Sequence, residues 1–215
     1  AISCDSAKTF EKHYRIFSKL NKQIFMFHLY GIASNLETFL KLTDCGVPFV
    51  QYRNKSTQNV DISKLPTSHS KIIINDSIED AIRLDAWGVH LGQQDLFKYT
   101  KKELLQRRIK LGISTHTEEE LYNSLEYSPD YLAYGPIFKT NTKFLSYPPC
   151  GVEKLRKIVR LSTVPVIAIG GLSFEHTSII RDTGAFGMAS ISKISSGNSQ
   201  FIKDWMRECQ LETFV

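Results

Sequence analysis

The chain has 215 residues and a mass of 24.5 kDa, which fits one domain or two small ones. Apolar residues make up 42% and aromatic residues 11% of the chain, enough to bury a full core and to exclude an intrinsically disordered protein. Twenty-seven basic residues against 22 acidic ones give a net charge of +5, too small for a dedicated nucleic-acid-binding protein.

The cysteines predict neither a disulfide framework nor a zinc site. Cys4, Cys45, Cys150 and Cys209 are far apart and show no C-x-x-C spacing. Reduced thiols are the default in the cytoplasm, so we expect a cytoplasmic protein. No apolar run approaches the roughly 20 residues that span a bilayer, and we expect no membrane partner.

The chain begins with an expected amphipathic extension, 1–23, ahead of a main domain at 24–215. The apolar residues at helical spacing in this extension are Phe10, Tyr14, Phe17 and Leu20. A targeting sequence is the alternative. Asp5 and Glu11 weaken it, because transit peptides contain few acidic residues.

Short apolar runs then alternate with segments of helical periodicity. The runs predict strands at 24–29, 48–53, 71–75, 88–91, 111–114, 131–134, 164–169 and 187–191. Helical patterns follow at 36–43, 78–84, 104–109, 118–125, 152–161, 174–183 and 200–209. Strands that are apolar throughout and separated by helices indicate a parallel sheet covered by helices. Eight such units predict an α/β fold of the (β/α)8 TIM barrel type. An open doubly wound sheet is the alternative, although its G-x-G-x-x-G fingerprint is absent.

Polar residues and glycines follow most of the predicted strands. In chain order they are Gln51, Arg53, Lys55, Asn75, Asp76, Gln93, Gln94, Asp95, Ser114, Thr115, His116, Thr140, Asn141, Thr142, Lys143, Gly170, Gly171, Ser190, Ile191 and Ser192. The carboxyl ends of barrel strands meet at one end, where the functional residues of such barrels lie. We therefore expect these segments to share one pocket.

Each group in this set has a functional interpretation and a structural one. Asp76 and Asp95 would hold Mg²⁺ together with phosphate oxygens, or each would cap the helix that follows it. Gly170 and Gly171, with the Ser192 hydroxyl, would open backbone N–H groups to a phosphate, or the glycines form a turn for geometric reasons.

The basic residues at this end also have two interpretations. Arg53, Lys55 and Lys143 would bind phosphate, or they are solvated surface cations. Ser114 and His116 lack a third triad member, so we expect no nucleophilic triad. His116 would donate to phosphate or move a proton.

The order of these segments resembles the thiamine phosphate synthase and thiazole tautomerase superfamily, over about residues 24–195. The motifs that carry the resemblance are 50–55 (VQYRNK), 72–76 (IIIND), 88–95 (GVHLGQQD), 112–117 (GISTHT), 135–143 (GPIFKTNTK) and 164–171 (VPVIAIGG).

The resemblance favours the synthase and implies a transferase. Such an enzyme joins hydroxymethylpyrimidine diphosphate to hydroxyethylthiazole phosphate, and releases thiamine phosphate and pyrophosphate by a dissociative substitution. It implies Mg²⁺ as cofactor, held by Asp76 and Asp95. Catalytic roles fall to Arg53, Lys55, Ser114 and Lys143. Substrate contacts fall to Gln51, Arg53, Lys55, Asn75, Ser114, Thr140, Thr142, Lys143, Gly171, Ile191 and Ser192. The expected partners are small phosphorylated substrates, and the choice between monomer and homo-oligomer stays open.

Several positions depart from the family pattern. Asn54 stands in place of a glutamate and Lys139 in place of a proline, the 56–70 segment is shorter than usual, and the first strand shows no Thr-Asp pair at 28–31.

Two other functions stay open. A tautomerase would share the barrel and use His116 as an acid or base, and a non-catalytic phosphate-binding relative is the third possibility. The retained Asn75, Asp76 and Asp95 favour the synthase.

Overall fold

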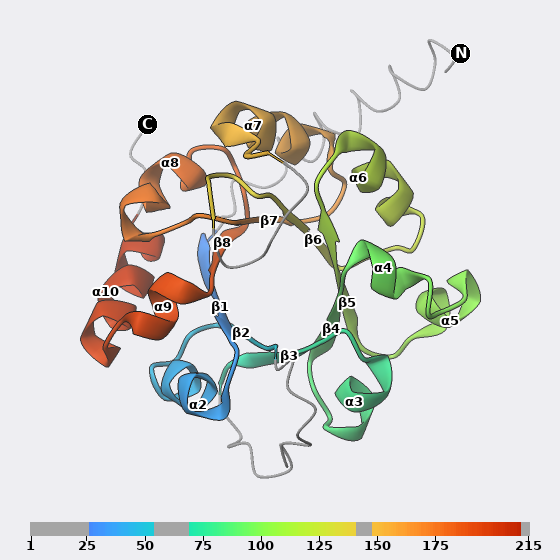
Figure 1. Cartoon of the computed structure of the whole chain (residues 1–215), viewed down its shortest axis with the longest axis horizontal. Helices are drawn as coiled ribbons and strands as arrows, with labels where there is room; N and C mark the ends of the chain where they lie inside the picture. Colours follow the sequence, from blue (N-terminus) through green and yellow to red (C-terminus); the bar gives the residue numbers. More distant parts are fainter. Residues whose placement is uncertain (1–25, 54–68, 141–147, 212–215) are drawn as a thin grey trace.

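A computed structural model describes residues 26–53, 69–140 and 148–211. Eight parallel strands close into a barrel in chain order, with β8 paired to β1. Helices surround this ring, as the view down the barrel shows (Figure 1). The predicted (β/α)8 barrel is confirmed, and the open doubly wound sheet is wrong because every strand has two neighbours. The expected extension, 1–23, lies outside the described residues.

The strands are short, four to six residues each. They are β1 (His28–Ala33), β2 (Phe49–Tyr52), β3 (Lys71–Asn75), β4 (Gly88–Leu91), β5 (Lys110–Thr115), β6 (Tyr131–Tyr134), β7 (Val166–Ile169) and β8 (Gly187–Ser190). The helices are α2 (Leu36–Asp44), α3 (Ile78–Arg83), α4 (Gln93–Leu96), α5 (Lys101–Gln106), α6 (Glu118–Leu125), α7 (Gly151–Leu161), the 3₁₀ turn η2 (Phe174–His176), α8 (Thr177–Arg181), α9 (Ser192–Ser196) and α10 (Ser199–Gln210). None of the helices described is long and apolar enough to cross a membrane.

The helices begin where polar side chains satisfy their first amides. The Asn35 side chain accepts from the Thr38 amide ahead of α2, and the predicted cap Thr117 accepts from Glu120 ahead of α6. Such caps stabilise a helix by about 1 kcal/mol each, because the first backbone N–H groups have no partner inside the helix.

Two apolar layers explain why the strands are hydrophobic on both faces. One face fills the barrel interior with a small cluster: Tyr30, Ile32, Phe49, Ile73, Tyr131, Ile167 and Ala189. The other face packs against the surrounding helices in the larger core, which includes Phe39, Leu132 and the fully buried Trp205. A barrel wall buried on both sides leaves polar side chains little room except at its two ends.

The first strand lies further along the chain than its apolar run predicts. The sequence predicts 24–29, but β1 spans His28–Ala33, where it pairs with both β2 and β8. Gly31 weakens the strand pattern in the sequence, yet a Cβ there would lie 2.8 Å from Leu42 Cδ1 of α2. The glycine lets α2 pack closely on β1. Residues 28–31, which lack the Thr-Asp pair of the family pattern, therefore lie at the start of β1 and not at its carboxyl end.

The helices at the carboxyl ends of β4, β7 and β8 also differ from the prediction. Residues 93–95 form the single-turn α4 instead of a loop, and the helix expected at 174–183 is divided into η2 and α8. A short helix, α9, follows β8 directly and has no counterpart in the predicted elements. At five residues it is too short for an amphipathic period to reveal it.

Candidate active site

A cavity of about 780 Å³ lies at the carboxyl ends of the strands. The described residues that were expected to have catalytic, metal-binding or substrate-binding roles all line this cavity: Gln51, Arg53, Asn75, Asp76, Asp95, Ser114, His116, Thr140, Gly171, Ile191 and Ser192. Gln93 and Thr115 were also expected in this pocket and do not line it. The Gln93 side chain donates to the Ser114 carbonyl and the Ser124 hydroxyl, and Thr115 is fully buried. The lining residues come from strands far apart in the sequence, and closure of the barrel brings them together. Lys55, Thr142 and Lys143 lie outside the described residues.

Asp76 occupies a strained backbone position at the end of β3. Its φ is +66°, in the left-handed region that L-residues other than asparagine and aspartate rarely adopt. The Ser77 amide donates to the Asn75 carbonyl at 3.0 Å and closes a γ-turn around Asp76, whose own amide donates to the His90 carbonyl at 2.9 Å. Backbone strain of this kind persists where the surroundings enforce it, and it concentrates at functional sites.

The helix-capping alternative is wrong for both aspartates, because the helix after Asp95, α5, is capped by Thr100. Helix α3 is capped by Ser77, whose side chain accepts from the Asp80 amide. Asp95 lies inside α4, where its Oδ2 accepts from the Gly92 amide at 3.1 Å. Its other oxygen, Oδ1, accepts from Lys98 Nζ at 2.7 Å. Asp95 thus supports the start of α4 and still lines the cavity.

The two carboxylates are close enough to perturb each other. Burial raises the pKa of Asp76, and the neighbouring Asp95 carboxylate raises it further, while Arg53 and Lys98 oppose the rise. Burial also acts to raise the pKa of Asp95, but hydrogen bonds, first from Lys98, bring it below its ordinary value. One carboxylate is therefore stabilised as an anion, and the other lies beside it with its charge only partly compensated.

This donor set fits Mg²⁺ better than zinc. The described residues contain no group of three His, Cys, Asp or Glu side chains that could hold a metal ion by themselves. Zinc sites in proteins use three or four such ligands, whereas Mg²⁺ is commonly held by one or two carboxylates together with substrate phosphates and water. Asp76 and Asp95 supply such a pair, and Arg53 lies in the same cavity.

The opposite side of the cavity carries the glycine pair after β7. Gly170 and Gly171 have φ values of +95° and +70°. A Cβ on Gly170 would lie 2.6 Å from Pro136 Cα, and one on Gly171 would lie 2.7 Å from the Lys139 carbonyl oxygen. The turn geometry thus requires glycine, and the same two residues line the cavity. The geometric interpretation and the functional one are compatible.

Two helical segments lie beside this glycine pair. The predicted helix after Gly171 begins at Phe174 as expected, with the 3₁₀ turn η2. Helix α9 begins at Ser192, which lines the cavity. A short extra helix after the eighth strand, next to the loop after the seventh, is a recurrent phosphate-binding arrangement in (β/α)8 barrels.

A family model described as thiamine monophosphate synthase matches residues 29–194. The chain belongs to this family. A thiamine-phosphate synthase of Citrobacter koseri is 33% identical over 190 residues, which cover 84% of this chain and 88% of the relative. One from Neisseria meningitidis is 30% identical over 175 residues, 77% of this chain and 85% of the relative. A solved thiamine phosphate pyrophosphorylase from Pyrococcus furiosus has a TM-score of 0.73 at 23% identity, covering 88% of this chain and 98% of that one, and supports the barrel fold.

His116 lies in a thiamine monophosphate synthase barrel with its ring orientation set by the backbone. Its Nδ1 lies 2.6 Å from the Gly135 carbonyl oxygen, which can only accept, so Nδ1 carries a proton. Its amide donates to Glu120 Oε2 at 2.6 Å, which fixes the start of α6 beneath it. The ring is held at the cavity wall, in a position to hydrogen-bond a substrate or to move a proton.

Four residues important to the site do not appear among the predicted ones. His90, Lys139 and Lys193 line the cavity, and Lys98 binds Asp95. His90 belongs to the 88–95 motif and lies between Val89 and Leu91, which pack on the helix side, so the alternation of the strand places it inside the barrel. Lys98 follows Asp95 by three residues, a spacing at which side chains meet on a helix, but the sequence does not show that a helix begins at residue 93.

Proposed function

We propose that this chain joins hydroxymethylpyrimidine diphosphate to hydroxyethylthiazole phosphate with Mg²⁺ as cofactor, and releases thiamine phosphate and pyrophosphate. Membership of the thiamine monophosphate synthase family and the curated relatives support this transferase activity. The free thiols of Cys45, Cys150 and Cys209 suit the cytoplasmic location that we propose for it.

The reaction exchanges one bond for another at the pyrimidine methylene carbon. The carbon–oxygen bond to the diphosphate breaks first, and the diphosphate leaves with the electron pair. The resulting pyrimidine cation is captured by the thiazole nitrogen, whose lone pair forms the new carbon–nitrogen bond. No covalent bond to the enzyme forms, so the protein contributes chiefly charge stabilisation of the leaving group and alignment of the partners.

The Asp76 side of the cavity would take the diphosphate. Arg53 offers a planar, always charged donor for phosphate oxygens, and Asn75 adds an amide. Asp76 and Asp95 would hold the cation. When bound, Mg²⁺ supplies positive charge to the diphosphate oxygens as the carbon–oxygen bond breaks. Lys55 and Lys143 complete this end of the proposal, and Ser114 lies nearby as a contact to the pyrimidine ring.

The glycine side of the cavity would take the thiazole phosphate. Gly171, Ile191 and Ser192 form its wall, with Thr140 next to them and Thr142 included in the proposal. Backbone N–H groups and hydroxyls bind a phosphate without adding net positive charge, which suits a group that keeps its charge throughout the reaction.

A single observation carries the proposal. One cavity joins a carboxylate pair with an arginine on one side to a glycine turn and short helix on the other. The synthase reaction needs two anion sites of different character, one for a leaving group that gains charge and one for a phosphate that does not. The third possibility, a non-catalytic binding protein, has no use for the carboxylates.

The tautomerase function stays as a second candidate because His116 is held at the cavity wall. Its Nδ1 proton is committed to the Gly135 carbonyl, and an imidazole held at this wall would exchange a proton with a bound thiazole. This chemistry needs no metal and no pyrimidine substrate.

Turnover with both phosphorylated precursors separates these functions. We expect thiamine phosphate to form with Mg²⁺ and not with excess chelator. Asp95→Asn should lower turnover by about 100-fold or more, since it removes one metal ligand. Asp80→Asn is the matched control, an exposed aspartate on α3 paired with Arg83. Product formation in chelator would contradict the metal role. Isomerisation of a thiazole phosphate carboxylate without pyrimidine, lost in His116→Ala, would support the tautomerase. Binding without product would support a non-catalytic protein.

A further inference from the structure

A continuous hydrogen-bonded chain crosses the interior of the barrel. Ser114 Oγ lies 2.9 Å from His90 Nε2, and His90 Nδ1 lies 3.0 Å from the Tyr131 hydroxyl. The Tyr131 and Tyr30 hydroxyls are 2.9 Å apart. Each link joins side chains from different strands, so the chain depends on barrel closure and not on local sequence.

The chain continues from Tyr30 back to the active-site cavity. The Tyr30 hydroxyl donates to Gln51 Oε1 at 3.3 Å, and Gln51 Nε2 donates to Asn75 Oδ1 at 2.7 Å. Gln51 is 2% exposed, so its amide has little access to water. Both ends of the chain, Ser114 and Asn75, line the catalytic cavity.

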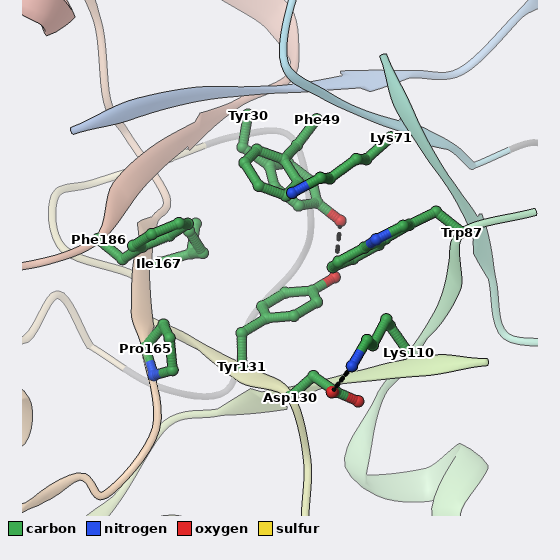
Figure 2. Close-up of a pocket in the computed structure, with 10 residues that line it drawn as sticks. All are labelled: Tyr30, Phe49, Lys71, Trp87, Lys110, Asp130, Tyr131, Pro165, Ile167 and Phe186. Atoms are coloured by element: carbon green, nitrogen blue, oxygen red, sulfur yellow. Dashed lines mark hydrogen bonds and ion pairs between the residues drawn. The ribbon is translucent and has the colours of Figure 1, made fainter. Parts of the chain in front are cut away.

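The middle of the chain lies at the other end of the barrel. Tyr30 and Tyr131 line a second cavity of about 220 Å³, formed by residues at the amino ends of the strands. Figure 2 shows their hydroxyl groups directed toward each other, with Phe49 and Trp87 nearby. The tyrosine pair therefore lies outside the catalytic cavity and would not touch a substrate bound there.

Gly112 makes room for this arrangement. A Cβ at Gly112 would overlap the end of the Tyr131 ring and its hydroxyl. The ring crosses β5 at this point to reach His90, with the two ring centroids 5.6 Å apart. Glycine at 112 and histidine at 90 belong to the 112–117 and 88–95 motifs, and the contact with Tyr131 gives both of them a structural role.

The two tyrosines each carry one proton, and this fixes the direction of the links. Burial raises the pKa of both Tyr30 and Tyr131, so both hydroxyls stay protonated. Tyr30 gives its proton to Gln51 and must accept from Tyr131. Tyr131 in turn accepts from His90 Nδ1, which leaves a lone pair on Nε2 to accept the Ser114 hydroxyl proton.

We propose that Tyr131 and Tyr30 are positioning residues that set the hydrogen-bonding polarity of the catalytic cavity. Through His90 they turn the Ser114 oxygen into an acceptor toward the substrate. Through Gln51 they occupy the Asn75 oxygen, so that Asn75 presents its NH₂ group as a donor.

This polarity suits the proposed substrates, and that part of the inference rests on the proposed function. An amide NH₂ beside Asp76 donates to diphosphate oxygens, whereas an amide oxygen there would repel them. An acceptor at Ser114 suits an amino group on a pyrimidine ring. The reversed chain, with every link turned around, would present an acceptor at Asn75 and a donor at Ser114, and would bind the same groups poorly.

The tautomer of His90 shows in which direction the hydrogen bonds of this chain run, and it can be measured without a substrate. In ¹⁵N-histidine-labelled full-length protein, long-range ¹H–¹⁵N spectra distinguish Nδ1–H from Nε2–H, and loss of one ring pattern in His90→Gln assigns the residue. We expect Nδ1–H in the native protein, and a mixture or Nε2–H in Tyr131→Phe. An Nε2–H ring in the native protein would overturn the proposal even if the enzyme is a fully active synthase.

Turnover measures the consequence. Tyr131→Phe and Tyr30→Phe keep the rings and remove only the hydroxyls. Each should lower kcat/KM for the pyrimidine diphosphate by about tenfold, the effect of one misdirected hydrogen bond. Tyr134→Phe is the matched control, because Tyr134 is a buried tyrosine on the same strand whose ring packs on the helix side. Unchanged kinetics in both hydroxyl deletions, or an equal loss in Tyr134→Phe, would contradict the positioning role.

Discussion

The Lys98 ammonium lies 2.7 Å from Asp95 Oδ1, so one of the two proposed metal ligands already holds a cation from its own chain. The Lys98 side chain is 59% exposed and can move away when a stronger cation arrives. Metal binding would then exchange an ion pair for a metal–carboxylate bond at Asp95. Lys98 is a competitor for this position as well as a stabiliser of the metal-free carboxylate.

Replacing Lys98 with methionine removes that competitor. We expect Lys98→Met to lower the Mg²⁺ concentration for half-maximal turnover severalfold, the scale of an exposed ion pair. Lys101→Met is the control, since it removes an exposed pair with Glu126 on the outer surface. A higher Mg²⁺ requirement in Lys98→Met alone would instead make Lys98 a diphosphate ligand.

We expect the charge of Asp76 to destabilise the metal-free protein at neutral pH. Its pKa is raised in the folded state, by burial first and by Asp95 second, so folding becomes less favourable as pH rises through the pKa values of the unfolded and then the folded state. Asp76→Asn removes this charge, and we expect it to raise the Tm at pH 7 by about 2 °C without metal.

The pH dependence separates this electrostatic effect from the effect of the substitution on backbone strain. Asparagine tolerates a positive φ better than aspartate, and that gain is the same at every pH. The electrostatic part should shrink as the pH falls, and it should vanish well below about 4, the ordinary pKa of an aspartate, where Asp76 is protonated in both states. Thermal unfolding of both proteins with chelator from acid to neutral pH measures it. A Tm difference that does not change with pH would show that Asp76 is not destabilised by its charge.

Gly171 tests the glycine side of the cavity separately. Gly171→Ala strains a φ of +70° and pushes a Cβ against the 138–139 backbone. We expect the KM for the thiazole phosphate to rise about tenfold or more, with less change for the pyrimidine diphosphate.

Gly184→Ala provides the comparison for Gly171. Gly184 has a φ of +82° but precedes β8, at the far end of the barrel from the catalytic cavity. Gly184→Ala should lose about 1 kcal/mol from the strained φ, without the backbone contact that a Cβ at 171 makes, and should keep both KM values. If both variants changed the two KM values alike, the glycine turn would have no special relation to the thiazole phosphate.

The barrel could be predicted from sequence because its signal is repeated. Apolar strands such as 71–75 and 131–134 are bounded by polar residues or by a Gly-Pro pair, and their predicted bounds match β3 and β6. The first strand shows the limit of this reasoning. Gly31 is needed for the approach of α2, and the apolar run before it attracts the prediction toward 24–29.

Site residues at the carboxyl ends of strands could be predicted from the sequence. Site residues that are positioned by side-chain packing could not. Asp76 directly follows β3 and Ser114 lies near the carboxyl end of β5, and barrel topology alone brings them to one cavity. His90 and Tyr131 meet only because Gly112 leaves space between them. The contact depends on a third strand having a glycine, with no side chain, at this position, and no pattern in the sequence reveals such a dependence.

The central claim is that one cavity holds a magnesium diphosphate and a thiazole phosphate at the same time. A crystal structure of the full chain grown with Mg²⁺, pyrophosphate and thiamine phosphate tests it most directly. The account predicts metal density bridging Asp76, Asp95 and the pyrophosphate, with the thiamine phosphate group against Gly171 and Ser192. Pyrophosphate bound away from both aspartates, or a phosphate group elsewhere than the glycine turn, would contradict it.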